Sequence, residues 1–303
     1  MSFVEIAQEN THISSERGFL LIHNNHVPTG RIPFDLIDAV IITARGVTHS
    51  NPALVKLCEK GIPVILCGKN FQPAGIITGI NIYHKQTERL ACQINADKPF
   101  HKKIWKHVVQ QKIRQQERLL AHHGVHRPEF PVMIKSVRSG DPDNIEAQAA
   151  RLYWNTLFGE DFIRDTDAEG QNSFLNYGYA VIRSAVARYV VATGLSPSIG
   201  IHHRNKLNPF CLVDDLMEPF RPAVDNIVYT LFSTEDGIKE LSPKYKRILA
   251  GLLESPVAID KSKITLQQTV RKYVLSFVHS LYLKNDCLIK FNLLFKNSYD
   301  NSK

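Results

Sequence analysis

The residues best suited to chemistry lie in one short, turn-rich segment. Residues 194–222 read GLSPSIGIHHRNKLNPFCLVDDLMEPFRP, in which two adjacent histidines, His202 and His203, precede a group of acids. The acids are Asp214, Asp215 and Glu218. A turn-rich segment that brings imidazole and carboxylate groups to the start of a helix is a common way to assemble a metal site. The segment therefore predicts a centre for a divalent cation.

The spacing of these acids supports this interpretation. Asp215 and Glu218 are three residues apart and Asp214 and Glu218 are four apart, so either pair lies on one face of a helix. Two neighbouring carboxylates repel each other without a cation, but they are the hard oxygen ligands that Mg²⁺ and Mn²⁺ prefer. A simpler alternative is an acidic helix start that interacts favourably with the helix dipole. For Asp214 in particular, this alternative stays open.

A further carboxylate, Glu146, lies in the segment DPDNIEAQAARLYWNTLFG. Asp143 can cap a helix that ends near Phe158, with Glu146 in the position of a capping box. Apolar residues follow Glu146 at helical spacing, namely Ala150, Tyr153 and Leu157. A carboxylate on an apolar line is costly unless a cation or hydrogen-bond donors meet it. The residues by themselves leave both roles open, as a cap and as a metal ligand.

Basic residues accompany these acids, and the whole chain carries a net charge of +8. Those nearest in sequence to the acids are Arg151, Arg204, Lys206 and Arg221. Cationic side chains bind the phosphates of a nucleic acid, while a metal polarises a phosphoryl oxygen and activates an attacking hydroxyl group. The combination predicts a metal-dependent reaction on DNA phosphodiesters. The chain has no H-E-x-x-H, P-loop or EF-hand motif and no His-Asp dipeptide, which argues against other metal and phosphate sites.

Two different patterns of elements must position these residues. Residues 1–80 contain five short apolar runs separated by turn signals, which predicts a β-rich domain resembling a sandwich or small barrel. The runs are FVEIA, GFLLIH, DAVIIT, PVILCG and AGIIT, with one helix expected at residues 51–60. Residues 81–97 are polar, and we expect them to form a linker. The predicted fold class is therefore α+β, with an N-terminal β-sandwich-like domain before a mainly α-helical catalytic domain at residues 98–303.

In the second part we expect helices at residues 98–122, 143–158, 171–193, 222–233, 243–253 and 264–283. The first of these has an apolar stripe at Trp105, Val109, Ile113 and Leu120. It also carries a basic set, Lys102, Lys103, Lys106, Lys112 and Arg114. This basic set fits either a solvated face or a surface that contacts DNA, and the sequence does not separate the two.

The composition is that of a soluble globular protein, with 44% hydrophobic and 22% charged residues among 303. No apolar run is long enough to cross a bilayer, and the N-terminus lacks a basic region followed by an apolar stretch. We therefore expect a cytoplasmic protein without membrane contact. The five cysteines form no C-x-x-C pair, so zinc-ribbon and thioredoxin-like sites are excluded.

Three of these motifs, taken in order, resemble the CRISPR-associated integrase family, the universal spacer-acquisition endonuclease. A glutamate in a segment such as residues 145–154 is followed by a Pro-x-x-Gly-x-x-His element and then by an acidic pair. Here the second element is Pro197, Gly200 and His203, and the pair is Asp215 and Glu218. The motif DLMEPFRP resembles the corresponding sequence in the branch of the family that accompanies type II CRISPR systems. The resemblance covers nearly the whole chain.

The resemblance implies roles for individual residues. It implies that Glu146, His203 and Glu218 bind a catalytic Mg²⁺ or Mn²⁺, with Asp215 as a supporting acid and His202 as a second-ranked neighbour. It also implies an N-terminal β-domain that forms a homodimer, a linker, a helical catalytic domain and a small ferredoxin-like partner protein from the adaptation machinery.

The implied reaction joins new DNA to a CRISPR array. A 3′-hydroxyl of a short double-stranded spacer precursor attacks a phosphodiester at the leader–repeat boundary, and related nuclease activities use the same site. Two other hypotheses remain. One is a non-catalytic nucleic-acid-binding scaffold whose acids only cap helices, and the other is a metal-dependent phosphohydrolase that acts on small phosphate esters.

Overall fold

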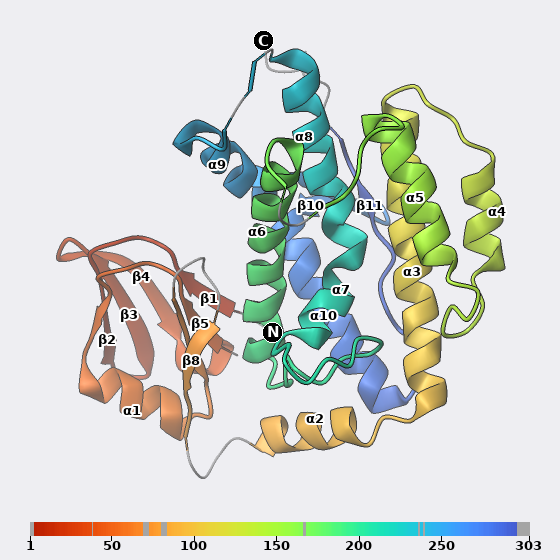
Figure 1. The fold of residues 1–303 in the computed structure, drawn as a ribbon. Helices are drawn as coiled ribbons and strands as arrows, with labels where there is room; N and C mark the ends of the chain where they lie inside the picture. The colour runs from red at the N-terminus through yellow and green to blue at the C-terminus, as the bar shows by residue number, and fades with distance from the viewer. Residues whose placement is uncertain are drawn as a thin grey trace. The chain divides into compact units, whose positions relative to one another are not determined.

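The computed structural model describes residues 3–37, 39–68, 73–79, 84–165, 168–235, 237–238 and 240–295. The chain forms two compact units, which Figure 1 draws along the chain from red to blue. Unit 1 comprises residues 1–95 and 187–197, and unit 2 comprises residues 96–186 and 198–303. The first segment of unit 1 ends at residue 95, two residues before the expected end of the linker.

The expected linker at residues 81–97 contains a helix, α2 (His84–Ile94), which belongs to unit 1. Arg89 donates a 2.8 Å hydrogen bond to the Thr193 carbonyl, and Gln93 donates a 2.9 Å bond to the Ser196 carbonyl. These long-range bonds join α2 to the segment that returns to unit 1 late in the chain. Polar side chains make these contacts, so the apolar pattern of the sequence gave no sign of that packing.

Within the described residues, unit 1 contains two four-stranded sheets of order β1-β5-β7-β8 and β4-β3-β2-β6. The first is parallel except for the antiparallel β7–β8 pair, and the second is antiparallel except for the parallel β2–β6 pair. Its elements are β1 (Phe3–Ile6), β2 (Thr11–Glu16), β3 (Phe19–Asn24), β4 (Val27–Pro33), η1 (Phe34–Leu36), β5 (Ala39–Ile42), β6 (Thr48–His49), α1 (Asn51–Glu59), β7 (Val64–Cys67) and β8 (Pro73–Ile77).

All five predicted apolar runs form strands, and the expected helix is α1. The sequence pattern missed β2, β4 and the two-residue β6, because THISSE is polar, VPTGRIP contains a turn signal and residues 48–49 form no apolar run. One buried cluster includes Ile13 and Leu20 from one sheet and Val40 and Val64 from the other. The two sheets therefore share a core, as a sandwich does.

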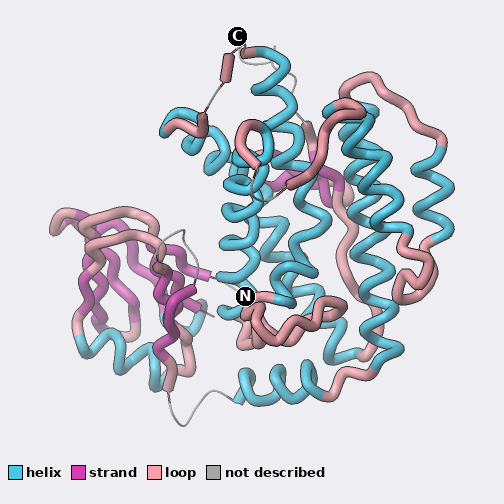
Figure 2. Tube along the Cα trace, viewed as in Figure 1, coloured by secondary structure: helices cyan, strands magenta, loops and turns pink. Residues whose placement is uncertain are grey.

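Unit 2 is mainly helical, as Figure 2 shows by colour, and the predicted α+β fold class is confirmed. Its helices are α3 (Lys98–His122), α4 (Glu129–Ser136), α5 (Ile145–Phe158), α6 (Gln171–Ala192, whose end belongs to unit 1), α7 (Cys211–Met217), η3 (Glu218–Phe220), α8 (Arg221–Thr234), α9 (Pro243–Ala250), η4 (Gly251–Glu254) and α10 (Leu266–Leu283). A small sheet of order β10-β9-β11, which the sequence did not predict, consists of β9 (Pro256–Ile259), β10 (Ser262–Thr265) and β11 (Asn292–Leu293).

Helix α3 is the element around which unit 2 is packed. It contacts α4, α5, α7, η3, α8 and β11, and Figure 1 shows α5 running beside it. Asp97 caps it by accepting the amide hydrogen of Phe100 at 2.8 Å, which explains why the helix begins where the sequence predicts. Its predicted apolar stripe is buried, with Trp105 only 2% exposed. Among the helices that the structure describes, none combines the length and apolar character needed to span a membrane.

Candidate active site

Helix α5 places Glu146 in its first turn through an unexpected cap. The Asp141 carboxylate accepts the amide hydrogens of Ile145 at 2.9 Å and Glu146 at 3.0 Å. The predicted cap, Asp143, instead pairs with Arg138 on the surface. The prediction was wrong because Asp141 and Asn144 adopt left-handed conformations, with φ of +49° and +52°, and turn the chain so that the earlier carboxylate faces the helix. The Glu146 side chain therefore serves no capping box.

Glu146 and Glu218 meet at one buried ammonium group. The Lys112 Nζ atom, in the middle of α3, lies 2.6 Å from Glu146 Oε1 and 2.6 Å from Glu218 Oε2. The other oxygen of Glu218 accepts a hydrogen bond from Nε of Arg221 at 2.9 Å and lies 2.9 Å from its Nη2. Two carboxylates that are distant in sequence thus converge on the same point, as the metal hypothesis requires.

The charges of this cluster stabilise one another. Burial opposes ionisation of Glu218, but Arg221 and Lys112 outweigh it and hold the pKa of Glu218 below its usual value. Burial likewise opposes the charged form of Lys112, yet the Glu218 and Glu146 carboxylates raise its pKa. The Arg221 guanidinium also lies 4.6 Å above the Tyr179 ring, which fixes its orientation. Glu218, Lys112 and Arg221 are therefore all charged near neutral pH.

Asp215 builds the loop that presents His203. Its fully buried carboxylate accepts the amide hydrogens of Ile201 at 2.6 Å, His202 at 2.8 Å and His203 at 3.3 Å. It also accepts from His203 Nδ1 at 2.5 Å, which fixes the tautomer and leaves Nε2 as the ring nitrogen for a metal. The supporting role that was expected for Asp215 is thus a positioning role.

Asp215 is also the main reason that the pKa of His203 is raised, and partial burial opposes this effect. The Asp215, Glu218 and Glu146 charges raise the pKa further, so the imidazole lies within the field of both predicted acidic ligands. The structure therefore brings Glu146 and Glu218 together at Lys112, and the charges of both raise the pKa of His203.

The Pro-x-x-Gly-x-x-His spacing has a steric explanation. A Cβ atom on Gly200 would lie 2.4 Å from the His203 carbonyl oxygen and 2.9 Å from Asp215 Oδ2, so no larger residue fits in this loop. His202 stacks on the Trp105 ring with centroids 4.3 Å apart, and His203 meets the same ring edge-on at 5.9 Å. His202 therefore packs beside His203 without taking part in the carboxylate cluster.

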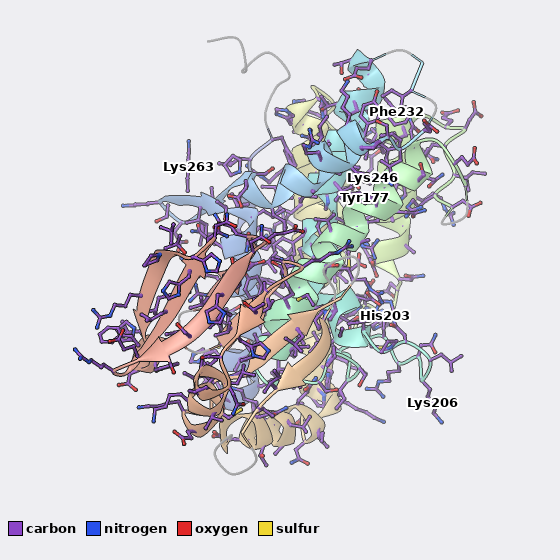
Figure 3. The ribbon with its side chains drawn as sticks, turned by 90° about the vertical axis from the view of Figure 1, so that its left-hand side faces the viewer. Tyr177, His203, Lys206, Phe232, Lys246 and Lys263 are labelled. Atoms are coloured by element: carbon purple, nitrogen blue, oxygen red, sulfur yellow. The ribbon has the colours of Figure 1, made fainter. Side chains whose placement is uncertain are left out.

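The predicted DNA-contacting residues fall into two groups. Arg151, Arg204 and Lys206 are exposed, and Figure 3 shows Lys206 extending from the loop that also carries His203. Arg221 instead pairs with Glu218, so it positions a carboxylate. Asp214, for which the sequence left two roles open, pairs with Arg183 at 2.6 Å, apart from the carboxylate cluster.

The cluster fits a divalent cation in its donor chemistry. Among the residues that the structure describes, no group of three or more His, Cys, Asp and Glu side chains forms a ready-made metal site. Glu218 Oε2 is buried, and although Lys112 lies at ion-pair distance, this oxygen has no hydrogen-bond partner of good geometry. Two carboxylates, one of them with this unsatisfied oxygen, and an oriented imidazole are suitable ligands for Mg²⁺ or Mn²⁺, so Glu146, His203 and Glu218 would hold the ion.

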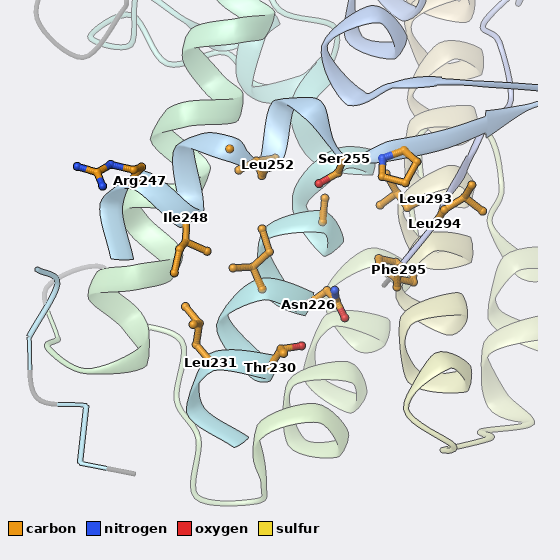
Figure 4. A pocket seen from close by; sticks show the side chains of 14 residues that line it. Asn226, Thr230, Leu231, Arg247, Ile248, Leu252, Ser255, Leu293, Leu294 and Phe295 are labelled. Carbon is orange, nitrogen blue, oxygen red and sulfur yellow. The ribbon is translucent and has the colours of Figure 1, made fainter. Parts of the chain in front are cut away.

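One hollow in unit 2 is lined by residues unsuited to the predicted chemistry. A cavity of about 430 Å³ is lined largely by aliphatic side chains from α8, η4 and the chain near β11, and Figure 4 shows them. Its lining contains no carboxylate or imidazole. The cavity therefore lacks the groups that the predicted chemistry needs.

The sequence interpretation missed the role of Lys112. It placed this lysine on a solvated or DNA-contacting face, whereas its side chain is 12% exposed and lies between two acids. The signal available in the sequence was weak, because Lys112 is next to the buried stripe residue Ile113 and looks like its basic neighbours. Only the packing of α3 against α5 and η3 distinguishes it.

Comparison with known proteins identifies the family of the chain. A family model described as CRISPR associated protein Cas1 matches residues 4–241. A curated CRISPR-associated endonuclease Cas1 from Neisseria meningitidis is 36% identical over 282 residues, which cover 92% of each chain.

Two solved structures share the fold. A casposase bound to integration product has a TM-score of 0.75 and 18% identity, covering 99% of this chain and 100% of the other. A chain of a partial Cas6-RT-Cas1–Cas2 complex has a TM-score of 0.73 and 17% identity, covering 98% and 99%. The match of the family model over most of the chain, together with the Neisseria relative, shows that the chain belongs to the CRISPR-associated Cas1 family.

Proposed function

We propose that this protein is a metal-dependent DNA endonuclease and integrase that inserts short DNA segments into a CRISPR array. The observation that carries the proposal is the convergence of Glu146 and Glu218 within 2.6 Å of one ammonium, in the field that also acts on His203. Membership of the Cas1 family and the name of the Neisseria relative, an endonuclease, support the same activity.

The proposed reaction is a transesterification. The oxygen of a DNA 3′-hydroxyl forms a bond to phosphorus, the existing phosphorus–oxygen bond to the leaving strand breaks, and the hydroxyl proton ends on the leaving oxygen. A bound Mg²⁺ or Mn²⁺ would supply charge stabilisation and lower the pKa of the attacking hydroxyl. Glu146, His203 and Glu218 would hold that ion.

The other residues of the site position these groups and the DNA. Asp215 keeps His203 Nδ1 protonated, so that Nε2 can bind the metal. Arg221 orients Glu218 from the side opposite to Lys112. The exposed Arg151, Arg204 and Lys206 neutralise the phosphates of the DNA substrate, which fixes its register without reading its sequence.

The first test uses purified variants and a branched DNA with Mn²⁺, with and without chelator. We expect Glu146→Gln and His203→Ala to lower strand joining by at least about a hundredfold while leaving the far-ultraviolet circular dichroism unchanged. Glu160→Gln, which changes an exposed glutamate in the turn after α5, is the matched control and should retain full activity. Full activity of both site variants would falsify the proposal.

A scaffold without chemistry gives a different result in the same assay. It would bind DNA equally well with and without chelator, and it would join no strands with any metal. A phosphohydrolase of small esters would release phosphate from mononucleotides, which an integrase should leave intact.

We propose double-stranded DNA, a second copy of the chain and a small ferredoxin-like protein as partners. One solved neighbour is a chain of a Cas1–Cas2 complex, and another is a casposase bound to an integration product, which supports a protein partner and a DNA partner. The DLMEPFRP motif supports association with the type II branch, which is part of the same proposal. We also propose a cytoplasmic location.

A further inference from the structure

We propose that Lys112 is a resident counter-cation of the metal site, whose ammonium holds Glu146 and Glu218 together in the metal-free protein and is displaced when a divalent ion binds. The inference rests on the proposed function, because it concerns the same carboxylates. It adds a role for a residue that takes no part in the chemistry proposed above.

The geometry places the ammonium where a metal ligand set would need its ion. Lys112 Nζ is 2.6 Å from an oxygen of Glu146 and 2.6 Å from an oxygen of Glu218, so it is shared by two carboxylates from separate elements. It donates a hydrogen bond to Glu146 but has no such bond of good geometry to Glu218 Oε2. The lysine therefore neutralises this position without fully satisfying it.

Charge balance shows why the ammonium must leave. Glu146 and Glu218 balance the charges of Lys112 and Arg221, so adding a divalent ion to the intact cluster would leave two excess positive charges at a buried site. Like charges at such short distances repel strongly where water is excluded. One of the two protein cations has to move away from the carboxylates.

Lys112 is the cation that can move. Arg221 contacts Glu218 with two nitrogens and lies over the Tyr179 ring, so several contacts fix its plane. Lys112 is held through a single terminal atom on a flexible four-carbon chain, and its partner Glu146 is 24% exposed. Its ammonium can therefore withdraw toward the open side of the site while Arg221 keeps Glu218 in place.

Two consequences follow from this arrangement. In the metal-free protein, Lys112 prevents repulsion between the two carboxylates and so stabilises the packing of α3 against α5 and η3. In the metal-binding reaction, the same contact is a competitor that weakens the affinity for the ion. The lysine thus sets the metal concentration at which the site fills.

The test measures Mn²⁺ binding to the full-length protein, without DNA, by calorimetry and by the electron paramagnetic resonance signal of free Mn²⁺. We expect Lys112→Met to tighten Mn²⁺ binding by about tenfold, which corresponds to about 1.4 kcal/mol of lost competition. Lys112→Arg keeps the charge and should not tighten binding. Lys106→Met is the control on the same helix, since Lys106 forms no ion pair with any residue that the structure describes.

The outcomes separate this inference from the proposed function. If wild-type binding disappears in Glu218→Gln but Lys112→Met leaves the affinity unchanged or weaker, the role of Lys112 is overturned and the metal site stands. If the wild-type protein shows no Mn²⁺ binding that depends on Glu218, the proposed metal site itself is contradicted. If Lys112→Met is unfolded without metal, we expect millimolar Mn²⁺ to refold it, and failure to refold contradicts the inference.

Discussion

At the scale of single residues, Asp215 holds the candidate site in shape. One carboxylate with no exposed surface accepts three consecutive backbone amides and the His203 ring. Hydrogen bonds of this kind replace the hydration that a carboxylate loses on burial. The loop of residues 200–203 is therefore built around Asp215, and Gly200 is the small residue that lets the loop close over it.

We predict that Asp215→Asn lowers the pKa of His203 and weakens Mn²⁺ binding by about 10- to 100-fold. The neutral amide removes the interaction that raises this pKa most. Only the neutral imidazole binds a metal, so the activity of the wild-type protein should fall as the pH drops through the raised pKa. In the variant, the same loss of activity should occur at a lower pH. Nuclear magnetic resonance titration of His203 measures the shift, and an unchanged pKa would contradict this role.

At the scale of elements, the start of α5 decides where Glu146 lies. Asp141 satisfies two amides at this helix end, whereas Asp143 forms only a surface ion pair. We predict that Asp141→Ala lowers the free energy of unfolding by about 0.5–2 kcal/mol, as loss of a helix cap does. Asp143→Ala should have little effect, because exposed ion pairs contribute little. Urea unfolding of both variants tests this, and equal losses would refute the assignment of the cap.

Helix α8 is joined to two other helices through one buried acid. The Asp225 carboxylate accepts the hydroxyl of Tyr153 from α5 at 2.7 Å and that of Tyr179 from α6. Tyr153 lies two turns beyond Glu146 on the same helix, and Arg221 precedes Asp225 on α8. The tyrosine–aspartate contact therefore sets how α5 and α8 pack. It thereby also sets the positions of the two acidic ligands, Glu146 on α5 and Glu218 just before α8.

Burial raises the pKa of Asp225 to about 6, although both tyrosine hydroxyls lower it. An acid whose pKa is raised by folding stabilises the protein below its unfolded pKa, and this contribution is lost as the pH rises from about 4 to about 6. We predict that wild-type stability loses up to about 3 kcal/mol more than Asp225→Asn across that window. Urea unfolding at several pH values measures the difference, and parallel profiles would contradict the prediction.

At the scale of the whole molecule, the net charge of +8 favours association with DNA. Arg204 and Lys206 are exposed on the loop that carries His203, so they are the cations best placed to meet DNA at the site. We predict that replacing both with alanine makes the slope of log Kd against log salt concentration shallower by about 1.8. The change should affect all DNA sequences alike.

The matched control removes two other exposed lysines of unit 2, Lys246 and Lys263, which Figure 3 shows away from His203. This double variant loses the same net charge but should keep the wild-type slope. Equal slopes for the two double variants would show that the contact depends on overall charge alone.

Much of the fold could be predicted from local pattern. Helix α3 begins and ends at the predicted residues because Asp97 caps its start and its stripe from Trp105 to Leu120 keeps a helical period. The apolar strands of unit 1 were predicted because each is a short apolar run between turn signals. The polar strand β2 was missed, and the polar, helix-compatible stretch that forms α2 was expected to be a linker, because its packing depends on a distant segment, as in the bond from Arg89 to Thr193.

By itself, the sequence determined the family motifs and the α+β class, and the resemblance carried by those motifs implied the candidate ligands Glu146, His203 and Glu218. These depend on residue type and short spacing, which a few turns of chain fix through backbone hydrogen bonds and periodic burial. The tertiary structure alone decided that Lys112 lies between two acids, that Asp215 serves His203 and that Arg221 serves Glu218. The reason is that a buried charge takes its partners from packing, and here the contact between Lys112 and Glu146 spans 34 positions of sequence.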